Sequence, residues 1–115
     1  MPTIAQRGDV VLVRFPFTDL TTAKLRPAVV LATHGRDLII VGVFSSPPQI
    51  PEPTWISLGS GDPTFPQTGL RASSVIKAER IAVVEHSVVV RKLGSLTSSQ
   101  MDALTRAVKL ALNLE

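Results

Sequence analysis

The stretch RPAVVLATHGRDLIIVGVF, residues 26–44, decides the fold of this 115-residue chain. It holds two apolar, β-branched runs, residues 26–33 and 37–44, separated by turn-forming residues 34–36. Runs of this length around a glycine-containing turn predict a β-hairpin. Both runs are almost continuously apolar, which is typical of strands buried on two faces or enclosed in a small barrel. Because Pro27 has no amide hydrogen, it fits only at the start of its strand or at a sheet edge.

Further strands are predicted on both sides of the hairpin, because β-branched or alternating patterns recur there. These segments are residues 9–15, 54–58, 70–84 (interrupted around 77–79) and 88–93. Proline, glycine and hydroxyl residues dominate the intervening stretches. The predicted loops are residues 15–25, 45–53 and 59–69, and the predicted turn is residues 85–87. Strands at this regular spacing favour a small barrel or sandwich over βαβ units.

The C-terminal segment changes to a helical period. Thr97 and Gln100 have the spacing of a capping box, and Leu96 with Met101 has that of a hydrophobic staple. The apolar face of the predicted helix consists of Met101, Leu104, Val108 and Leu112. We therefore expect one domain over residues 1–115, mainly β, with a single packed helix at its end.

Composition and charge narrow the class of protein. Hydrophobic residues make up 44% of the chain and charged residues 18%, a balance too apolar for a disordered tail. No apolar run is long enough to cross a bilayer, and the first residues lack a signal peptide's apolar core, so a cytoplasmic protein is expected. Cysteine is absent and two histidines occur, which excludes disulfides and predicts no metal or cofactor. The net charge of +3 favours an acidic or polyanionic partner.

Two loops remain as candidates for a site, since the sequence has no glycine-rich phosphate loop, serine-hydrolase elbow or paired histidines at metal spacing. An antiparallel hairpin sets the first residue of one strand near the last of the other, so Arg26 and Ser45 are expected at one end. Arg26, Lys24 and hydroxyl groups there would hold a phosphate. Phe17 would stack on a base. The alternative from residues alone is that Arg26 pairs with Asp19 and Ser45 merely ends a strand.

Gly8-Asp9, followed by the first strand, and Arg26-Pro27 resemble the N-terminal signature of MazF/PemK-like toxins of type II toxin–antitoxin systems. The resemblance runs on through a third strand that ends in hydroxyl residues, a central strand pair near residues 73–77 and the final helix. It implies an SH3-like β-barrel with an added helix, generally a homodimer. The implied activity is sequence-selective, metal-independent endoribonuclease cleavage of single-stranded RNA.

The resemblance also assigns roles to particular residues. The family's catalytic arginine matches Arg26, and its catalytic threonine matches Ser45, with Ser46 one step away as the alternative. The RNA 2′-hydroxyl would attack the adjacent phosphorus, and Arg26 and Ser45 would stabilise the charge that develops on the phosphoryl oxygens. Arginine holds its proton too tightly to be a good general base, although the family also assigns it acid–base roles. The predicted substrate-binding residues are Phe17, Lys24, Ser46, Arg71, Ser74 and Lys77.

Two departures from the family pattern leave other functions open. Residues 18–25 lack the family's Gly, Glu and Gln, while Ser74 takes the place of an aspartate and Arg71 is one residue out of register. A catalytically impaired member that binds an antitoxin or nucleic acid is therefore an alternative. An unrelated SH3-like adaptor for proline-rich peptides fits less well, since aromatic residues make up 4% of the chain. The implied partners are single-stranded RNA, a second copy of the chain, an acidic and partly disordered antitoxin, and operator DNA reached through that antitoxin, with no membrane.

Overall fold

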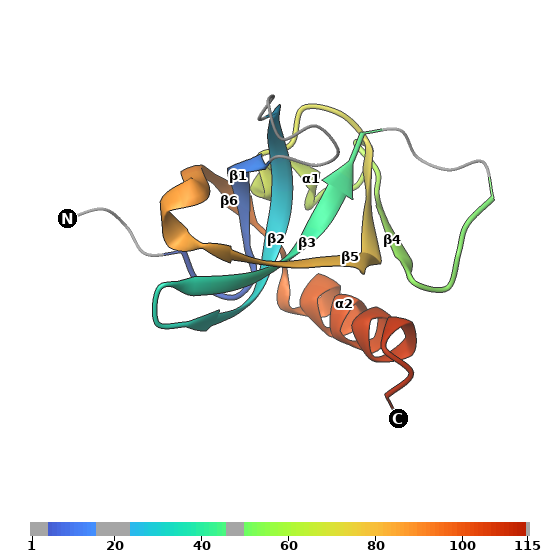
Figure 1. The fold of residues 1–115 in the computed structure, drawn as a ribbon. Coiled ribbons are helices and arrows are strands. Elements are labelled where there is room, and N and C mark those ends of the chain that lie inside the picture. The colour runs from blue at the N-terminus through green and yellow to red at the C-terminus, as the bar shows by residue number, and fades with distance from the viewer. Residues whose placement is uncertain (1–4, 16–23, 46–49, 115) are drawn as a thin grey trace.

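The computed structural model describes residues 5–15, 24–45 and 50–114. Six strands form one antiparallel sheet in the order β4-β5-β3-β2-β1-β6 (Figure 1). The strands are β1 Asp9–Phe15, β2 Lys24–His34, β3 Asp37–Phe44, β4 Trp55–Leu58, β5 Ser74–Glu85 and β6 Val89–Ser95. The helices are α1 Phe65–Thr68, the 3-10 helix η1 His86–Val88 and α2 Ser98–Ala111. The predicted class, mainly β with a C-terminal helix, is confirmed.

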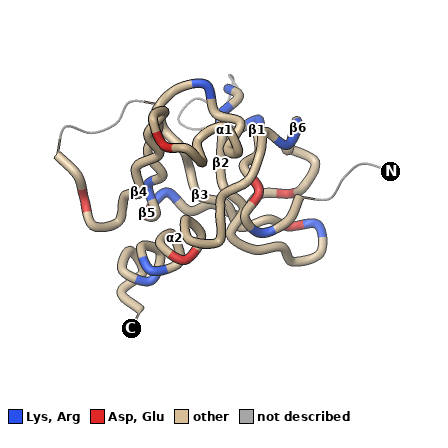
Figure 2. The backbone as a smooth tube through the Cα atoms, turned by 180° about the vertical axis from the view of Figure 1, so that it is seen from behind, with Lys and Arg blue, Asp and Glu red and all other residues tan. Residues whose placement is uncertain are grey.

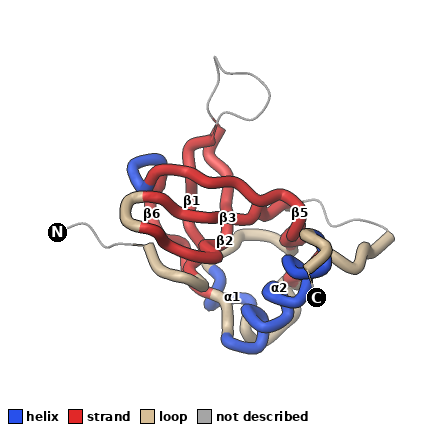
Figure 3. The backbone as a smooth tube through the Cα atoms, turned by 60° about the horizontal axis from the view of Figure 1, so that its bottom comes forward, coloured by secondary structure: helices blue, strands red, loops and turns tan. Residues whose placement is uncertain are grey.

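The described ladders leave the sheet open. β4 and β6 stand at the two ends of the strand order, and no ladder within the described residues joins them. Helices α1 and α2 lie on the same side of the strands (Figure 3). Within the described ranges, no helix has the length and apolar character needed to span a bilayer.

The predicted hairpin is present as β2 and β3. Residues 35–36 form its turn, and Gly35 has a φ of 61°, in the left-handed region that favours glycine. The β2–β3 register begins at Ala28, whereas Pro27 pairs with Leu12 of β1. At Pro27, β2 therefore has a described neighbour on one side, β1. This position suits proline, which has no amide hydrogen to donate to a second strand.

Apolar clusters cover both faces of the sheet. One cluster includes Val29, Ile76 and Leu104 and packs the strands against the helices. The other includes Val30 and Leu38 on the opposite face. Because the adjacent residues Val29 and Val30 are both 0% exposed, β2 is buried on two faces, as its continuous apolar run predicts.

The Gly8-Asp9 pair fixes the start of β1. The Gly8 amide donates to the Val30 carbonyl, and the Leu96 amide donates to the Gly8 carbonyl, both at 2.9 Å. Gly8 has a φ of 93°, which a larger residue adopts only with strain. Asp9 is 6% exposed and pairs with Lys92 at 3.2 Å. In this structure the pair ties β1 to β2 and β6.

Helix α2 begins as the sequence predicts. The Thr97 hydroxyl accepts from the Gln100 amide at 3.1 Å, and the Gln100 side chain accepts from the Thr97 amide at 2.8 Å, which completes the capping box. Met101 and Leu104 are buried in the core. The predicted apolar face is wrong at Leu112, which caps the C-terminus of the helix and is 51% exposed.

The structure also differs from the prediction within residues 59–69 and 70–84. The predicted loop at residues 59–69 contains α1, which has Pro66 in its first turn and Gly69 in the left-handed conformation at its end. Proline and glycine favour helix ends as well as loops, so the pattern did not separate the two. β5 begins at Ser74, and the predicted interruption is a register break. Residues 77–80 stand opposite Gly42 alone, between the pairs Val41–Ile81 and Val43–Ile76.

Candidate functional site

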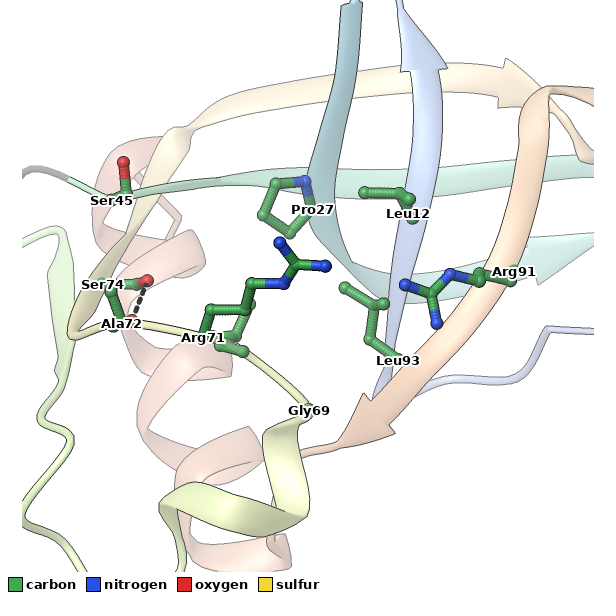
Figure 4. Close-up of a pocket in the computed structure, with 10 residues that line it drawn as sticks. Leu12, Pro27, Ser45, Gly69, Arg71, Ala72, Ser74, Arg91 and Leu93 are labelled. Atoms are coloured by element: carbon green, nitrogen blue, oxygen red, sulfur yellow. Dashed lines mark hydrogen bonds between the residues drawn. The ribbon is translucent and has the colours of Figure 1, made fainter.

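A pocket of about 360 Å³ opens beside the shared end of β2 and β3 (Figure 4). It lies between β1, β2, β6 and the segment that joins α1 to β5. Five of its lining residues matter for chemistry, namely Pro27, Ser45, Arg71, Ser74 and Arg91. The lining residues include three of the positions predicted from sequence, Ser45, Arg71 and Ser74.

Two arginines direct their guanidinium groups into this pocket from different elements. Arg71 follows α1, and Arg91 lies on β6 (Figure 4). Ser45 and Ser74 stand at the end of the pocket away from Arg91. None of the described lining residues is acidic. Guanidinium groups match phosphate oxygens with two parallel hydrogen bonds, so the pocket suits an anion that carries several oxygens.

Backbone contact between α1 and β6 holds the wall that presents Arg71. A Cβ atom added at Gly69 would stand 1.9 Å from the Leu93 carbonyl oxygen. One added at Gly94 would stand 2.1 Å from the Gln67 carbonyl oxygen. Both distances are far inside van der Waals contact, so glycine alone fits at these two positions. The wall is therefore fixed by main chain rather than by movable side chains.

The two pocket serines differ in their surroundings. Ser45 is exposed at the end of β3. Ser74 is 4% exposed, and its hydroxyl donates to the Ala72 carbonyl at 2.8 Å (Figure 4). The Ser74 hydroxyl thus stabilises the turn that follows Arg71, and its hydrogen atom is already used in this hydrogen bond. Ser45 is the pocket serine whose hydroxyl has no hydrogen-bond partner among the described residues.

Arg26 reaches the same end of the hairpin from the other face of the sheet. The β1–β2 register pairs Leu12 with Pro27 and Val13 with Arg26. Successive side chains of a strand point to opposite faces, and Pro27 lines the pocket, so Arg26 leaves the strand on the opposite face. Its side chain is half-buried. The structure thus places Arg26 and Ser45 at one end of the fold, on two sides of it.

The other predicted contacts are spread along the chain. Lys24 is exposed at the start of β2 and shares a face with Arg26, two residues on. Lys77 lies on β5 at the register break. Phe17 and Ser46 lie outside the described residues. Figure 2 shows the lysines and arginines on several elements rather than in one stripe.

Sequence reasoning missed the side chains that surround Lys77. Its Nζ atom lies 4.7 Å from the centroid of the Phe44 ring and 4.8 Å from that of Trp55. The Trp55 Nε1 donates to one carboxylate oxygen of Glu79 at 2.7 Å, and the Thr54 hydroxyl donates to the other at 2.8 Å. The pairs Trp55–Lys77 and Phe44–Val75 bring these residues together. Such register is set by distant strands, which a single local pattern does not reveal.

The carboxylate of Glu79 is held in its charged form. Burial raises the pKa of Glu79, but hydrogen bonds from the Trp55 indole, its own backbone and the Thr54 hydroxyl, together with the charge of Arg80, outweigh burial. The net pKa lies below the ordinary value of 4.5. At neutral pH the carboxylate therefore accepts from Trp55 and Thr54 and fixes the indole ring.

The open six-stranded sheet and its C-terminal helix define a small, mainly β protein, and two arginines line its pocket. The family model for PemK-like, MazF-like toxins of type II toxin–antitoxin systems matches residues 6–112. The chain belongs to this family. No curated protein matches the chain.

Solved structures of several bacterial toxins share the fold. An endoribonuclease in complex with its cognate antitoxin, from a mycobacterial species, has 21% identity and a TM-score of 0.74, covering 96% of this chain and 97% of that one. The Mycobacterium tuberculosis toxin MazF-mt6 has 18% identity and a TM-score of 0.71, with coverages of 93% and 98%. A MazE–MazF structure from Deinococcus radiodurans has 16% identity and a TM-score of 0.76, with coverages of 98% and 100%.

Proposed function

We propose that this chain is the toxin of a type II toxin–antitoxin pair and cleaves single-stranded RNA as an endoribonuclease in the cytoplasm. Membership of the toxin family supports the proposal. The observation that carries it is the pocket at the end of β2 and β3, which Arg71, Arg91 and Ser45 line together and to which none of the described lining residues adds a carboxylate. A phosphodiester is the group in RNA that such a donor set fits.

The proposed reaction uses the RNA's own nucleophile. The ribose 2′-oxygen bonds to the adjacent phosphorus, and the bond from phosphorus to the 5′-oxygen of the next nucleotide breaks. The products are a 2′,3′-cyclic phosphate and a free 5′-hydroxyl, which takes up a proton as the 2′-hydroxyl gives one up. Negative charge grows on the phosphoryl oxygens in the transition state, so fixed cationic and hydroxyl donors accelerate the step.

Arg26 and Ser45 divide this task between two faces. RNA that passes over the end of the hairpin meets Ser45, Arg71 and Arg91 on the pocket side and Arg26 on the other side. We assign Arg26 and Ser45 to transition-state stabilisation, and Arg71 and Arg91 to holding neighbouring phosphates. Arg26 lies on β2 and Ser45 directly follows β3, so the backbone at both positions is placed before the charge develops.

Cleavage of a mixed RNA pool by the purified protein tests this assignment. Arg26→Ala should lower the cleavage rate by about 100-fold or more, as the loss of one fixed oxyanion donor does. Ser45→Ala should lower it by about tenfold, because a neutral donor contributes less than a charged one. The matched control is Arg36→Ala, an exposed arginine in the turn at the far end of the same hairpin. An intact RNA pool with the wild-type protein would refute the enzymatic assignment.

A catalytically impaired family member is the second candidate. Ser74 favours it, since it stands where the family resemblance implies an aspartate and its proton is committed to the Ala72 carbonyl. Such a protein would bind an acidic antitoxin segment or RNA tightly and leave the RNA uncut. Binding and cleavage measured on the same preparation separate the two candidates.

The proposal also covers the protein partners of the chain and the curvature of its sheet. Structures that pair MazE with MazF support an antitoxin as the partner of this chain. We infer a homodimer held by an acidic, partly disordered antitoxin, through which the toxin also reaches operator DNA. We also infer that the sheet curls as an SH3-like barrel with an open seam between β4 and β6, which its burial on both faces supports.

A further inference from the structure

The cluster around Trp55 forms a built surface on the face of the sheet opposite the pocket. We call it the Trp55 platform, and it consists of Phe44, Trp55, Lys77, Glu79 and Arg80. We propose that the Trp55 platform binds a nucleobase and its phosphate in the single-stranded RNA that runs past the pocket. The inference rests on the proposed function, because it extends the RNA path of the same site.

The register break in β5 creates the platform. Four residues, 77–80, stand opposite Gly42 alone, so this part of β5 departs from regular pairing with β3. Irregularities of this kind re-aim side chains and are frequent beside functional sites. On the other side, Lys77 pairs with Trp55 of β4, which is the last strand of the described sheet. The platform therefore occupies an edge that a chain of RNA can reach.

The Trp55 ring is held in place before any ligand arrives. Both carboxylate oxygens of Glu79 are used, one by the Trp55 indole and one by the Thr54 hydroxyl. The Phe44 ring lies close over Gly42, where an added Cβ atom would stand 3.0 Å from the ring. A fixed ring such as that of Trp55 loses little conformational freedom when a base stacks on it, which favours binding.

The chemistry of the platform favours RNA. The Lys77 ammonium group lies between the two rings, and no carboxylate within the described residues forms an ion pair with it. Lys77 and Arg80 carry two positive charges against the one negative charge of Glu79. Aromatic faces beside cationic groups are what proteins use to bind single strands, because every base offers a π-face and every nucleotide a phosphate.

The platform is continuous with the proposed cleavage site. Phe44 and Ser45 are consecutive, so the platform and the pocket lie on either side of one strand end. Ala28 pairs with Gly42, so the two side-chain positions share a face of the sheet. Arg26 lies two residues from Ala28 and Phe44 two residues from Gly42, so Arg26 and Phe44 share that face as well. A strand of RNA that crosses this end meets the pocket, then Arg26, then the platform.

Trp55 is the one tryptophan of the chain, so its fluorescence reports directly on the platform. The probe is a short mixed-sequence oligoribonucleotide methylated at every 2′-oxygen, which removes the nucleophile and prevents cleavage. Titration into the wild-type protein should quench the Trp55 emission. Trp55→Ala and Lys77→Gln should each raise the Kd, measured by anisotropy of the labelled probe, by about tenfold, as expected for loss of one stacked base or one phosphate contact.

Three controls keep the result specific. Trp55→Phe retains a stacking ring and should restore most of the affinity that Trp55→Ala loses. Lys109→Gln removes an exposed charge from α2 and should leave the Kd unchanged. Circular dichroism and thermal unfolding establish that each variant is folded, and the wild-type quenching requires no variant at all.

The outcomes separate this proposal from the proposed function. Binding without quenching, or a Kd that Trp55→Ala leaves unchanged, overturns the platform even if wild-type protein cleaves unmodified RNA. Quenching with the expected Kd changes supports the platform even if no RNA is cleaved. Quenching by an acidic peptide but not by the RNA probe also overturns it, because the platform would then serve a protein partner.

Discussion

The wall of the pocket and the Trp55 platform stand on either side of one strand end and are built in different ways. At the pocket, main chain touches main chain, with added Cβ atoms at Gly69 and Gly94 placed 1.9 and 2.1 Å from carbonyl oxygens. At the platform, side chain touches side chain, and a Cβ atom at Gly42 would meet the Phe44 ring at 3.0 Å. A clash between main-chain atoms cannot be relieved by rotating a side chain. A clash with the Phe44 ring can be relieved, because the ring can turn.

This difference in construction predicts different roles for the pocket and the platform. A wall fixed by main chain keeps the backbone that presents Arg71 in place whether or not a ligand is bound, which positions the RNA phosphates for the reaction. The platform combines the Trp55 ring, which Glu79 holds, with the Phe44 ring, which can shift, and stacking on such rings tolerates different bases because every base has a π-face. The pocket is therefore expected to set the rate of cleavage, and the platform is expected to set affinity for the flanking RNA.

The largest expected effect comes from replacing one glycine at the pocket wall and one at the platform. Gly94→Ala should lower the free energy of unfolding by about 3 kcal/mol, because the backbone of α1 must move away from β6. Gly42→Ala should cost about 1 kcal/mol, because the Phe44 ring can shift. Denaturant unfolding measures both. Gly59→Ala, with nothing within 4 Å of its added Cβ atom, is the control and should stay within about 0.5 kcal/mol. Equal costs at Gly94 and Gly42 would contradict the contrast.

A smaller effect is expected from the charges of the pocket. Arg71→Gln and Arg91→Gln should each weaken binding of the 2′-methylated RNA about tenfold and reduce the slope of log K against log salt by about 0.7, the amount for one phosphate contact on a single strand. Binding at several salt concentrations gives both quantities. An unchanged slope in either variant would show that the arginine contacts no phosphate.

The sequence predicts the fold well where its signals are local. The capping box at Thr97 and the two apolar runs around residues 34–36 depend on neighbours along the chain, and both predictions hold. Helix α1 was missed because Pro66 and Gly69 are as typical of loops as of helix ends.

The candidate site is harder to predict from the sequence than the fold is. Arg91 reads locally as an exposed strand residue, and its approach to Arg71 depends on the contact between α1 and β6. Trp55 meets Lys77 through a register that is set across two strands. Arg26 and Ser45 were placed correctly at one end of a hairpin, but the face that each occupies follows from pairing with β1, which the local pattern does not contain.

The smallest expected effect concerns pH and the platform alone. The folded-state pKa of Glu79 lies below 4.5, so this carboxylate adds stability at pH values above 4.5 and loses it as the pH falls through the folded-state value. The contribution should be at most about 0.5 kcal/mol, because solvent screens an exposed carboxylate. Thermal unfolding of wild type and Glu79→Gln should therefore show a difference at neutral pH that shrinks on the acid side of 4.5. Trp55 emission should change over the same acid range in the wild type and stay constant in Glu79→Gln, because the indole hydrogen bond weakens when protonation removes the negative charge of its acceptor. Parallel emission profiles in the two proteins would show that Glu79 does not hold the ring, and the platform would then lack the fixed geometry that distinguishes it from an ordinary sheet edge.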